Sequence, residues 1–301
     1  MARVCEDWFP KGSRPNQKKD GFYMDDNLKR QIEIMAKNIT HDWDFTIIIT
    51  GGGEVRVGKS LLEMQIMAYW SWLIEKLHGI KVPFSIKENI VFNWHKLIDQ
   101  GHKLAQKTKY CALGYDEAGE TMEGTKTQSK ELRAVRDYLR ECGQYNFLNI
   151  LVMPEFFDLP KGIAITRSIF LIDVYYITDQ TGIFKRGFFK FYSRKNKKQL
   201  YIKGKKDLNY NAHVYNFDGR FYNFYPVDEK EYREEKIEAL KNRATGNVDK
   251  VHEIRNGLLY ILHKKAGWTY QQIAQEIKKL TYFDLPKATI SDAITSFTGQ
   301  E

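Results

Sequence analysis

Apolar and polar positions along the chain follow two periods that alternate. Short apolar runs occur at 45–49, 110–115 and 147–153, and such runs are typical of strands buried on both faces of a sheet. Between them, apolar residues recur at helical spacing, as at 26–38 and 129–142. Strands that alternate with helices predict βαβ units, so the expected fold class is α/β with a mainly parallel sheet flanked by helices.

The composition changes from Gly187 onward, where aromatic and basic residues replace the β-branched ones. Segments 188–192, 200–202 and 221–225 are expected to be short strands or an extended return segment. Residues 228–243 are highly charged and predict a helix or a linker.

A glycine-rich stretch, TGGGEVRVGKS, connects the first apolar run to the helical pattern that follows it. It satisfies G-x-x-x-x-G-K-[ST] with Gly53, Gly58, Lys59 and Ser60. Backbone N–H groups of such a loop and of the helix N-terminus bind phosphate oxygens, the lysine adds a positive charge, and the hydroxyl can bind Mg²⁺. We therefore expect ATP to bind Gly53, Gly58, Lys59, Ser60 and Leu61. A glycine-rich turn before an amphipathic helix is the alternative.

An acidic pair, Asp116 and Glu117, follows the run at 110–115. A carboxylate at a strand end can hold Mg²⁺ beside Ser60, so Ser60 and Asp116 are the predicted metal residues. Glu117 is the predicted base that polarises the attacking water, and Lys59 and Asp116 complete the catalytic set. The alternative is a solvated strand end without a chemical role.

These motifs, together with the stretch LRAVRDYLRECGQYNFLNILVMP, resemble the additional-strand branch of P-loop ATPases. Within that branch the chain is similar to DNA motors of the FtsK and HerA type and to zonular-occludens-toxin-like ATPases. The resemblance covers residues 43–180 and implies a homo-oligomeric ring, for example a hexamer, that hydrolyses Mg-ATP to move DNA. In such motors an arginine-rich helix and a glycine precede the strand beside the acidic pair. Here Arg136, Arg140 and Gly143 occupy those places.

The end of that strand departs from the family pattern. These families usually place Gln or another small polar residue there to sense the γ-phosphate, whereas this chain reads VMPE at 152–155. Gln144, Asn146 and Glu155 are the alternative sensors.

Arginines form a further candidate set. Arg133, Arg136 and Arg140 recur at helical spacing, and Arg167 precedes an expected strand at 168–174. In ring ATPases one subunit inserts an arginine into the site of its neighbour to stabilise charge on the transferring phosphoryl group. Arg140 and Arg167 are the predicted fingers. The alternative is a solvated helix face with local ion pairs.

A basic and aromatic segment, FKRGFFKFYSRKNKKQLYIKGKK at 184–206, contains no acidic residue. Lysines near phosphate release counterions and exposed rings stack on unpaired bases, so the segment is a predicted DNA contact. The alternative is an edge hairpin whose rings face the core and whose lysines deter aggregation. The lysines predicted to contact DNA are Lys195, Lys197, Lys198, Lys205 and Lys206.

Helical patterning returns near the end of the chain, at 254–262, 270–280 and 288–297. The stretch GWTYQQIAQEI…KATISDAITSF resembles a helix-turn-helix module with an extended turn, or a winged-helix variant. The resemblance implies that the third helix enters the major groove of DNA. Thr289 and Ser291 would then reach base edges, and Lys287 would touch phosphate. A helical bundle for partner docking or oligomerisation is the alternative.

These predictions divide the chain into four parts. Residues 1–40 form an N-terminal arm and helix, and 41–227 form the P-loop ATPase domain with the basic aromatic segment. A linker at 228–247 leads to a small all-α, helix-turn-helix-like domain at 248–301.

Composition sets the expected location and partner. The chain has 301 residues with 43% hydrophobic content, and its net charge of +9 suits an anionic partner such as DNA. The three cysteines, Cys5, Cys111 and Cys142, lack metal-ligand spacing, which favours a reducing compartment. No apolar stretch is long enough for a membrane span and the N-terminus lacks the apolar core of a signal peptide. The cytoplasm of a prokaryote or of a viral host is the expected location.

The sequence as a whole favours an oligomeric ATPase that moves or remodels DNA in replication, packaging or transfer. A nucleotide-switched DNA-binding or loader protein with slow hydrolysis is the first rival. A small-molecule kinase is the second, and the basic segment and terminal helices argue against it.

Overall fold

The computed structural model describes residues 4–5, 22–116, 118, 130–244, 255–281 and 285–298. The chain divides into two compact units, Met1–Lys236 and Ile237–Glu301. Helix α8 (Glu229–Ala244) begins in the first unit and ends in the second.

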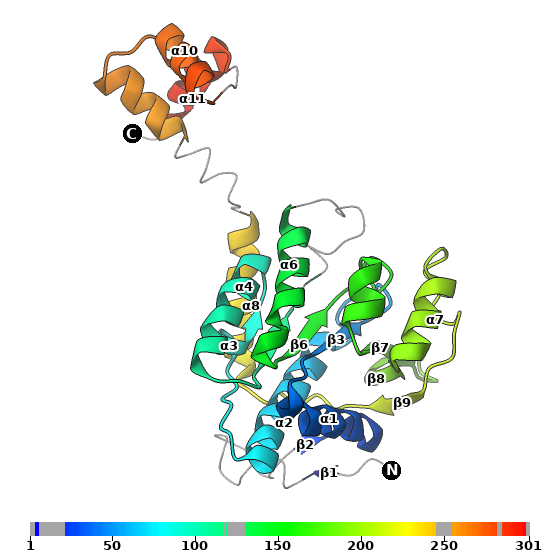
Figure 1. Ribbon diagram of the computed structural model, residues 1–301. Coiled ribbons are helices and arrows are strands. Elements are labelled where there is room, and N and C mark those ends of the chain that lie inside the picture. The colour runs from blue at the N-terminus through cyan, green and yellow to red at the C-terminus, as the bar shows by residue number, and fades with distance from the viewer. Residues whose placement is uncertain are drawn as a thin grey trace. The chain divides into compact units, whose positions relative to one another are not determined.

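A seven-stranded sheet forms the centre of the first unit, in the order β4-β5-β6-β3-β7-β8-β9 (Figure 1). Neighbouring strands are parallel from β4 to β7, whereas β8 and β9 run antiparallel to their neighbours. The strands are β3 (Phe45–Thr50), β4 (Ile90–Val91), β5 (Ala112–Tyr115), β6 (Leu148–Val152), β7 (Phe170–Thr178), β8 (Phe184–Tyr192) and β9 (Phe217–Arg220). A separate two-stranded pair consists of β1 (Val4–Cys5) and β2 (Phe22–Tyr23).

The apolar runs form the central strands because these strands are covered on both faces. Every residue of β3 and of β6 is buried. The two strands pair in parallel, from Phe45 with Leu148 to Ile49 with Val152. An additional strand, β6, therefore lies between β3, which precedes the glycine loop, and β5, which Asp116 directly follows. This mostly parallel sheet with flanking helices confirms the predicted α/β class and fits a P-loop NTPase fold.

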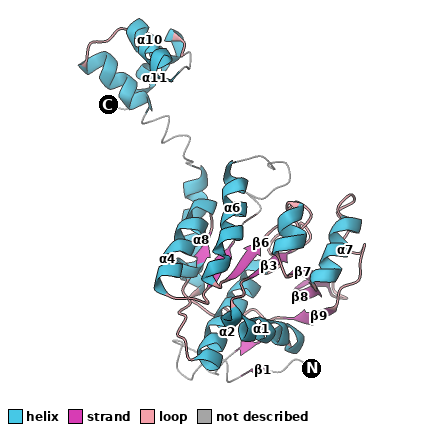
Figure 2. Cartoon of the chain, viewed as in Figure 1, coloured by secondary structure: helices cyan, strands magenta, loops and turns pink. Residues whose placement is uncertain are grey.

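Helices cover both faces of the sheet (Figure 2). On one face α1 and α2 pack against each other, and α2 contacts β3, β5 and β6. On the other face α4 lies over β4 and β5, α6 packs on α4, and α7 lies over β7 and β8. These helices and the short α3 are α1 (Asp26–Asn38), α2 (Lys59–His78), α3 (Ile86–Asn89), α4 (Trp94–Lys107), α6 (Lys130–Glu141) and α7 (Arg194–Gly204).

Two of the predicted strands are wrong. Residues 200–202 lie inside α7, and the return strand is β9 rather than 221–225. The reason is that the apolar positions of this segment have helical spacing once a buried lysine is counted with them. The buried residues of α7 are Lys197, Leu200, Tyr201 and Gly204.

The charged segment at 228–243, for which a helix or a linker is expected, forms the helix α8. Residues 229–236 belong to α8 and pack on the first unit. Tyr232 is 6% exposed, and its ring lies 6.1 Å from that of Phe92, which follows β4. The charge pattern leaves open whether this segment is a helix or a linker, and the buried ring of Tyr232 anchors it as a helix on the first unit.

The second unit is helical and has its own small core. It contains a helical segment at 255–260 that continues as a π-helical turn, Ile261–Lys265, followed by α10 (Tyr270–Thr281) and α11 (Lys287–Thr298). Among the described residues, the buried members of this core are Leu259, Ile273, Ile290, Ala293 and Ile294.

Thr269 begins α10 with a reciprocal cap. Thr269 Oγ1 accepts from Gln272 N at 3.3 Å, and Gln272 Oε1 accepts from Thr269 N at 2.8 Å.

In the parts of the chain that the structure describes, no helix combines the length and apolarity that crossing a membrane requires.

Candidate nucleotide-binding site

The loop between β3 and α2 has a backbone that demands glycine. Gly52, Gly53 and Gly58 have φ angles of 55°, 80° and 105°, a region that side chains rarely adopt. Gly51 is required for space, because a Cβ there would lie 2.8 Å from a valine methyl of the loop and 3.1 Å from Lys59 Nζ. Gly58 is the N-cap of α2, and no side chain of the described residues caps this helix. Backbone N–H groups at an uncapped helix start form a cradle for phosphate.

Lys59 begins α2 and directs its ammonium group into this loop. Its Nζ donates to Glu54 O at 2.6 Å. The loop is held to the end of β6, because Gly53 N donates to Pro154 O at 2.9 Å. An ammonium group enclosed by a glycine loop at a helix start fits the binding of a triphosphate. The predicted nucleotide residues all lie at this junction; they are Gly53, Gly58, Lys59, Ser60 and Leu61.

Ser60 and Asp116 are in direct contact at the start of α2. Ser60 Oγ donates to Asp116 Oδ1 at 3.0 Å, and Asp116, at the end of β5, is 1% exposed. Mg²⁺ prefers oxygen ligands and is commonly held by one or two protein groups together with substrate phosphates. The hydroxyl and carboxylate therefore fit the predicted magnesium site.

The second oxygen of Asp116 has partners that no sequence motif indicates. Asp116 Oδ2 accepts from Tyr232 OH at 2.6 Å and from Lys236 Nζ at 3.0 Å, both on α8. Burial and the nearby carboxylate raise the pKa of Tyr232 well above its usual value, so its hydroxyl remains a donor. Glu117, the predicted base, lies outside the described residues, and its role stays a prediction.

Another carboxylate, Glu155, lies at the tip of the glycine loop. Its Oε2 is 3.7 Å from the position that a Cβ of Gly53 would take. Its Oε1 accepts from Tyr210 OH at 2.6 Å and from Phe157 N at 3.1 Å. Burial raises the pKa of Glu155, and the hydrogen bond from Tyr210 opposes that rise. One oxygen is thus fixed by donors, while the other faces the loop.

Tyr210 connects this carboxylate to the end of β3. Its hydroxyl accepts from Phe156 N at 2.9 Å and lies 3.2 Å from Thr50 Oγ1. Its ring packs edge-on against Phe157 at 4.9 Å between centroids. Nothing in the sequence marks Tyr210, because it lies far along the chain from Thr50 and belongs to no motif.

A third acid, Asp173, is buried beside the loop on β7. It pairs in register with Thr50, is 5% exposed, and its Oδ1 makes no hydrogen bond to any described residue. Burial raises the pKa of Asp173 to about 7, although Lys190 opposite it on β8 favours the charged form. The strand β7 was predicted, but not the importance of this position.

Glu155 alone among the three alternative sensors lies near the loop. Gln144 is in the 3₁₀ turn Cys142–Tyr145, which precedes β6 and so lies at the other end of that strand. Asn146 ends this turn, and its Nδ2 donates to Asp42 Oδ1 and Trp43 O, each at 3.2 Å.

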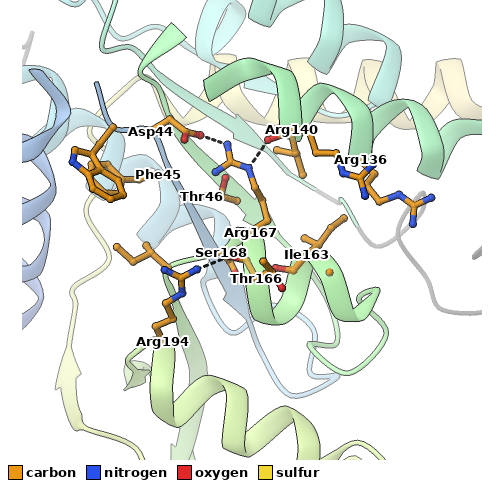
Figure 3. A pocket seen from close by; sticks show the side chains of 14 residues that line it. Asp44, Phe45, Thr46, Arg136, Arg140, Ile163, Thr166, Arg167, Ser168 and Arg194 are labelled. Atoms are coloured by element: carbon orange, nitrogen blue, oxygen red, sulfur yellow. Dashed lines mark hydrogen bonds and ion pairs between the residues drawn. The ribbon is translucent and has the colours of Figure 1, made fainter. Parts of the chain in front are cut away.

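A pocket of about 440 Å³ lies at the amino end of β3, opposite the glycine loop (Figure 3). Its lining includes four arginines: Arg136, Arg140, Arg167 and Arg194. Arg194 donates to Thr166 O at 3.1 Å, and Arg136 has a buried Nε without a hydrogen bond to described residues. Both predicted fingers therefore lie at the end of the sheet away from the phosphate loop of their own subunit.

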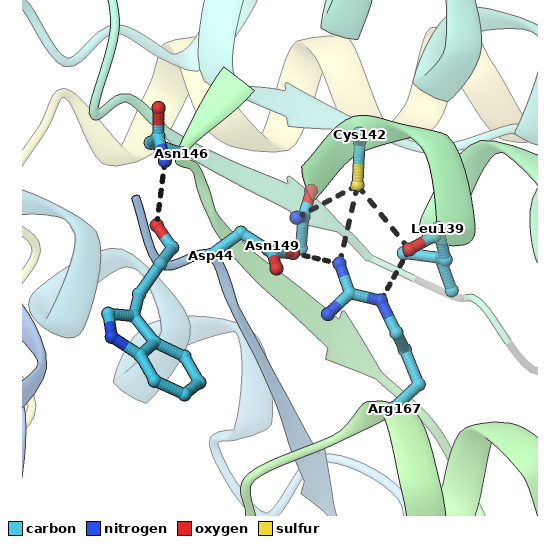
Figure 4. Close-up of polar contacts among 7 residues, drawn as sticks. Asp44, Leu139, Cys142, Asn146, Asn149 and Arg167 are labelled. Atoms are coloured by element: carbon cyan, nitrogen blue, oxygen red, sulfur yellow. Dashed lines mark hydrogen bonds and ion pairs between the residues drawn. The ribbon is translucent and has the colours of Figure 1, made fainter. Parts of the chain in front are cut away.

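Arg167 is fixed inside this pocket (Figure 4). Its guanidinium forms an ion pair with Asp44 and donates from Nε to Leu139 O, and Nη2 lies 3.6 Å from Cys142 Sγ. Arg140 is different, because its side chain is 67% exposed and, among the described residues, forms a 3.6 Å ion pair with Asp137 on its own helix. The guanidinium of Arg167 is thus engaged within its own chain, whereas the side chain of Arg140 is exposed.

One predicted DNA contact is wrong. Lys197 is fully buried, and its Nζ donates to Ala164 O at 2.6 Å, to Ser168 O at 2.7 Å and to Ser168 Oγ. Burial lowers the pKa of Lys197 to about 7. The side chain ties α7 to the π-helical turn Gly162–Arg167 and cannot reach phosphate. The remaining predicted lysines of this segment are exposed; they are Lys195, Lys198, Lys205 and Lys206.

Most aromatic rings of the basic segment face the core. Phe189, Phe191, Tyr192 and Tyr201 are at most 4% exposed, whereas Phe184 is 65% exposed. These four rings face the core, as the alternative expects, but Tyr201 lies in α7 and β8 is not an edge strand because β9 pairs with it. In the second unit, Lys287 at the start of α11 is exposed, and Thr289 and Ser291 are half-buried.

A scan of protein-family models finds no match to this chain, and a search of curated proteins finds none either. Among solved structures, the chain is similar to the genome packaging NTPase B204 from Sulfolobus turreted icosahedral virus 2 in complex with ATP-gammaS. That match has 15% identity, covers 51% of this chain and 94% of the other, and has a TM-score of 0.33. The DNA-packaging ATPase B204 from Sulfolobus Turreted Icosahedral Virus matches at 17% identity, with 52% and 95% coverage and a TM-score of 0.35. At such values the fold assignment rests on the sheet order and the glycine loop alone.

Proposed function

We propose that this protein is a magnesium-dependent ATPase that acts on DNA as an oligomer. The observation that carries the proposal is the glycine cradle around Lys59, in contact with the Ser60–Asp116 pair. The loop N–H groups and Lys59 would hold the triphosphate. When bound, Mg²⁺ would offset phosphate charge at Ser60 and Asp116.

Two carboxylates are candidates for activating water. Glu117 is the base that the acidic pair predicts, and Glu155 offers an oxygen that faces the loop and a pKa raised by burial. Replacing each by glutamine separates them. The variant that lacks the base should lose turnover by about 100-fold or more and still bind ATP, whereas the other should retain most of its turnover.

The proposed DNA contacts are the exposed lysines of the basic segment and, in the second unit, Lys287, Thr289 and Ser291. The exposure of the lysines and the net charge of +9 support electrostatic attraction to phosphate. Arg140 is the proposed finger between subunits, because it is exposed on α6 and belongs to the lining of the arginine-rich pocket.

ATP turnover measured with and without single- and double-stranded DNA tests this proposal. We expect DNA to stimulate turnover and Lys59→Ala to abolish it. Equal rates with and without DNA would remove the role on DNA and leave an ATPase. Failure of the wild-type chain to bind ATPγS with Mg²⁺ would remove the ATPase as well.

A nucleotide-switched DNA-binding protein with slow hydrolysis is the second candidate function. It is favoured by the contact of Lys236 with Asp116, because an ammonium group on this carboxylate competes with Mg²⁺ for it. DNA binding that requires ATPγS, without DNA-stimulated turnover, would support this candidate over the motor.

A further inference from the structure

Asp116, the carboxylate proposed to bind Mg²⁺, accepts hydrogen bonds from two different helices. Ser60 of α2 binds one carboxylate oxygen, and Tyr232 and Lys236 of α8 bind the other. Lys236 Nζ also lies 3.3 Å from Tyr232 OH, so the three groups form one closed network. Asp116 is 1% exposed, which makes these contacts its immediate environment rather than a surface ion pair.

The first half of α8 is fixed at this place by packing as well as by charge. The ring of Tyr232 packs near Phe92 and near Tyr225, with centroids 6.1 and 6.4 Å apart. Lys87 Nζ of α3 lies 3.8 Å from Oε1 of Glu235, a residue that lies between Tyr232 and Lys236 in the sequence. The same helix continues to Ala244 and thus into the second unit of the chain.

The two α8 groups differ in how they relate to a metal at Asp116. A tyrosine hydroxyl donates to a carboxylate that binds metal, which is a common way to orient such a ligand. An ammonium group carries the same sign of charge as the metal and takes up the same carboxylate. At a buried site with low dielectric this like-charge repulsion is strong.

We propose that Tyr232 and Lys236 are positioning residues for Asp116, and that Lys236 leaves this carboxylate when the site takes up nucleotide with Mg²⁺. Lys236 supplies the counter-charge of Asp116 in one state of the site, and its departure loosens α8. The helix therefore reports the state of the nucleotide site to the chain segment that follows it. This inference rests on the proposed function, since it requires nucleotide binding at the glycine loop.

Hydrogen exchange of residues 229–244 in the full chain tests the inference. Exchange is compared in the free protein, with ATPγS in excess EDTA, and with ATPγS and Mg²⁺. We expect exchange in α8 to rise by about tenfold only when metal and nucleotide are both present. Unchanged exchange in α8 under conditions where ATPγS and Mg²⁺ are bound would overturn the inference and leave the proposed function intact.

Two substitutions should shift metal affinity in opposite directions. Coupling between sites is reciprocal, so Lys236→Met should lower the Mg²⁺ concentration needed for half-maximal binding of a fluorescent ATP analogue by about tenfold. Tyr232→Phe should raise that concentration by about tenfold, because Asp116 loses an orienting donor. Lys230→Met is the matched control, since Lys230 lies on the same helix, is 86% exposed and pairs only with Glu234 among the described residues.

The directions of these two shifts in Mg²⁺ affinity decide whether Lys236 leaves Asp116 when metal binds. Weaker Mg²⁺ binding in Lys236→Met would show that the ammonium group supports the bound state, and would overturn the inference. An equal loss in both variants would indicate a merely structural contact, with the same consequence. Absence of binding in the wild-type chain, or binding that survives Lys59→Ala, would instead contradict the proposed function.

Discussion

Asp173 makes the stability of the first unit depend on pH in a direction that can be calculated. Its carboxyl is buried on β7 beside the glycine loop, and Oδ1 makes no hydrogen bond to the described residues. Burial raises its pKa from 3.8 to about 7. The folded chain therefore binds this proton more tightly than the unfolded chain does, and the charged form opposes folding.

The size of the effect follows from this shift. Because the pKa of Asp173 is raised in the folded state, its stabilising contribution is complete below the unfolded pKa of 3.8 and is lost as the pH rises to about 7. A shift of about three units corresponds to about 4 kcal/mol at about 1.4 kcal/mol per unit. About 3 kcal/mol of this loss falls between pH 5 and pH 8.

Asp173→Asn removes the titration and keeps the size of the side chain. Urea unfolding at pH 5, 6, 7 and 8 should show that the variant gains about 3 kcal/mol relative to wild type across this range. Asp179→Asn is the control. Hydrogen bonds from Thr181 and Ile183 lower the pKa of Asp179 to about 2, so its contribution is lost only in strong acid. A constant difference between Asp173→Asn and wild type from pH 5 to pH 8 would refute the reasoning.

Three further predictions concern other parts of the first unit. Gly58→Ala should abolish ATP binding and lower the free energy of unfolding by about 2 kcal/mol, because φ is 105° and a Cβ would lie 3.1 Å from the ring of Phe221; unchanged ATP affinity would contradict this. Lys198→Ala should reduce the slope of log affinity for DNA against log salt by about 1, whereas buried Lys197→Met should leave that slope unchanged. Arg167→Ala should lower the free energy of unfolding by about 3 kcal/mol, because it leaves the partly buried Asp44 without its cation. A loss of less than about 0.5 kcal/mol in a urea titration would show that this ion pair does not stabilise the fold.

The sequence predicts the phosphate loop well because its function requires a local geometry. Gly53, Gly58, Lys59 and Ser60 lie within a few residues of one another, so their spacing along the chain fixes their spacing in space. The apolar runs predict the central strands for the same reason, since burial on both faces leaves a simple pattern. The motif does not include Gly51, although this residue belongs to the same glycine triplet and the loop has no space for a side chain there.

Contacts that join distant segments leave no such pattern. Tyr210 meets Thr50 across 160 positions of the chain, and Tyr232 meets Asp116 across 116. Lys197 shows the opposite error: a lysine in a basic run was expected in solvent, yet three backbone and side-chain oxygens hold it in the interior. Both kinds of error arise because burial and long-range partners depend on the tertiary fold rather than on residue type.

The acids at the nucleotide end of the sheet differ in how the fold offsets their charge. Burial raises the pKa of Asp173 to about 7, so this group is partly protonated at neutral pH, whereas the charge of Glu155 is offset by hydrogen bonds from Tyr210 OH and Phe157 N. Asp116 is the most deeply buried of the three and accepts from two hydroxyls and one ammonium group. A buried carboxylate that must remain charged to bind metal needs a cation in every state of the site. Lys236 meets that need before metal arrives, and it does so because the first half of α8, far along the sequence, packs beside the phosphate site.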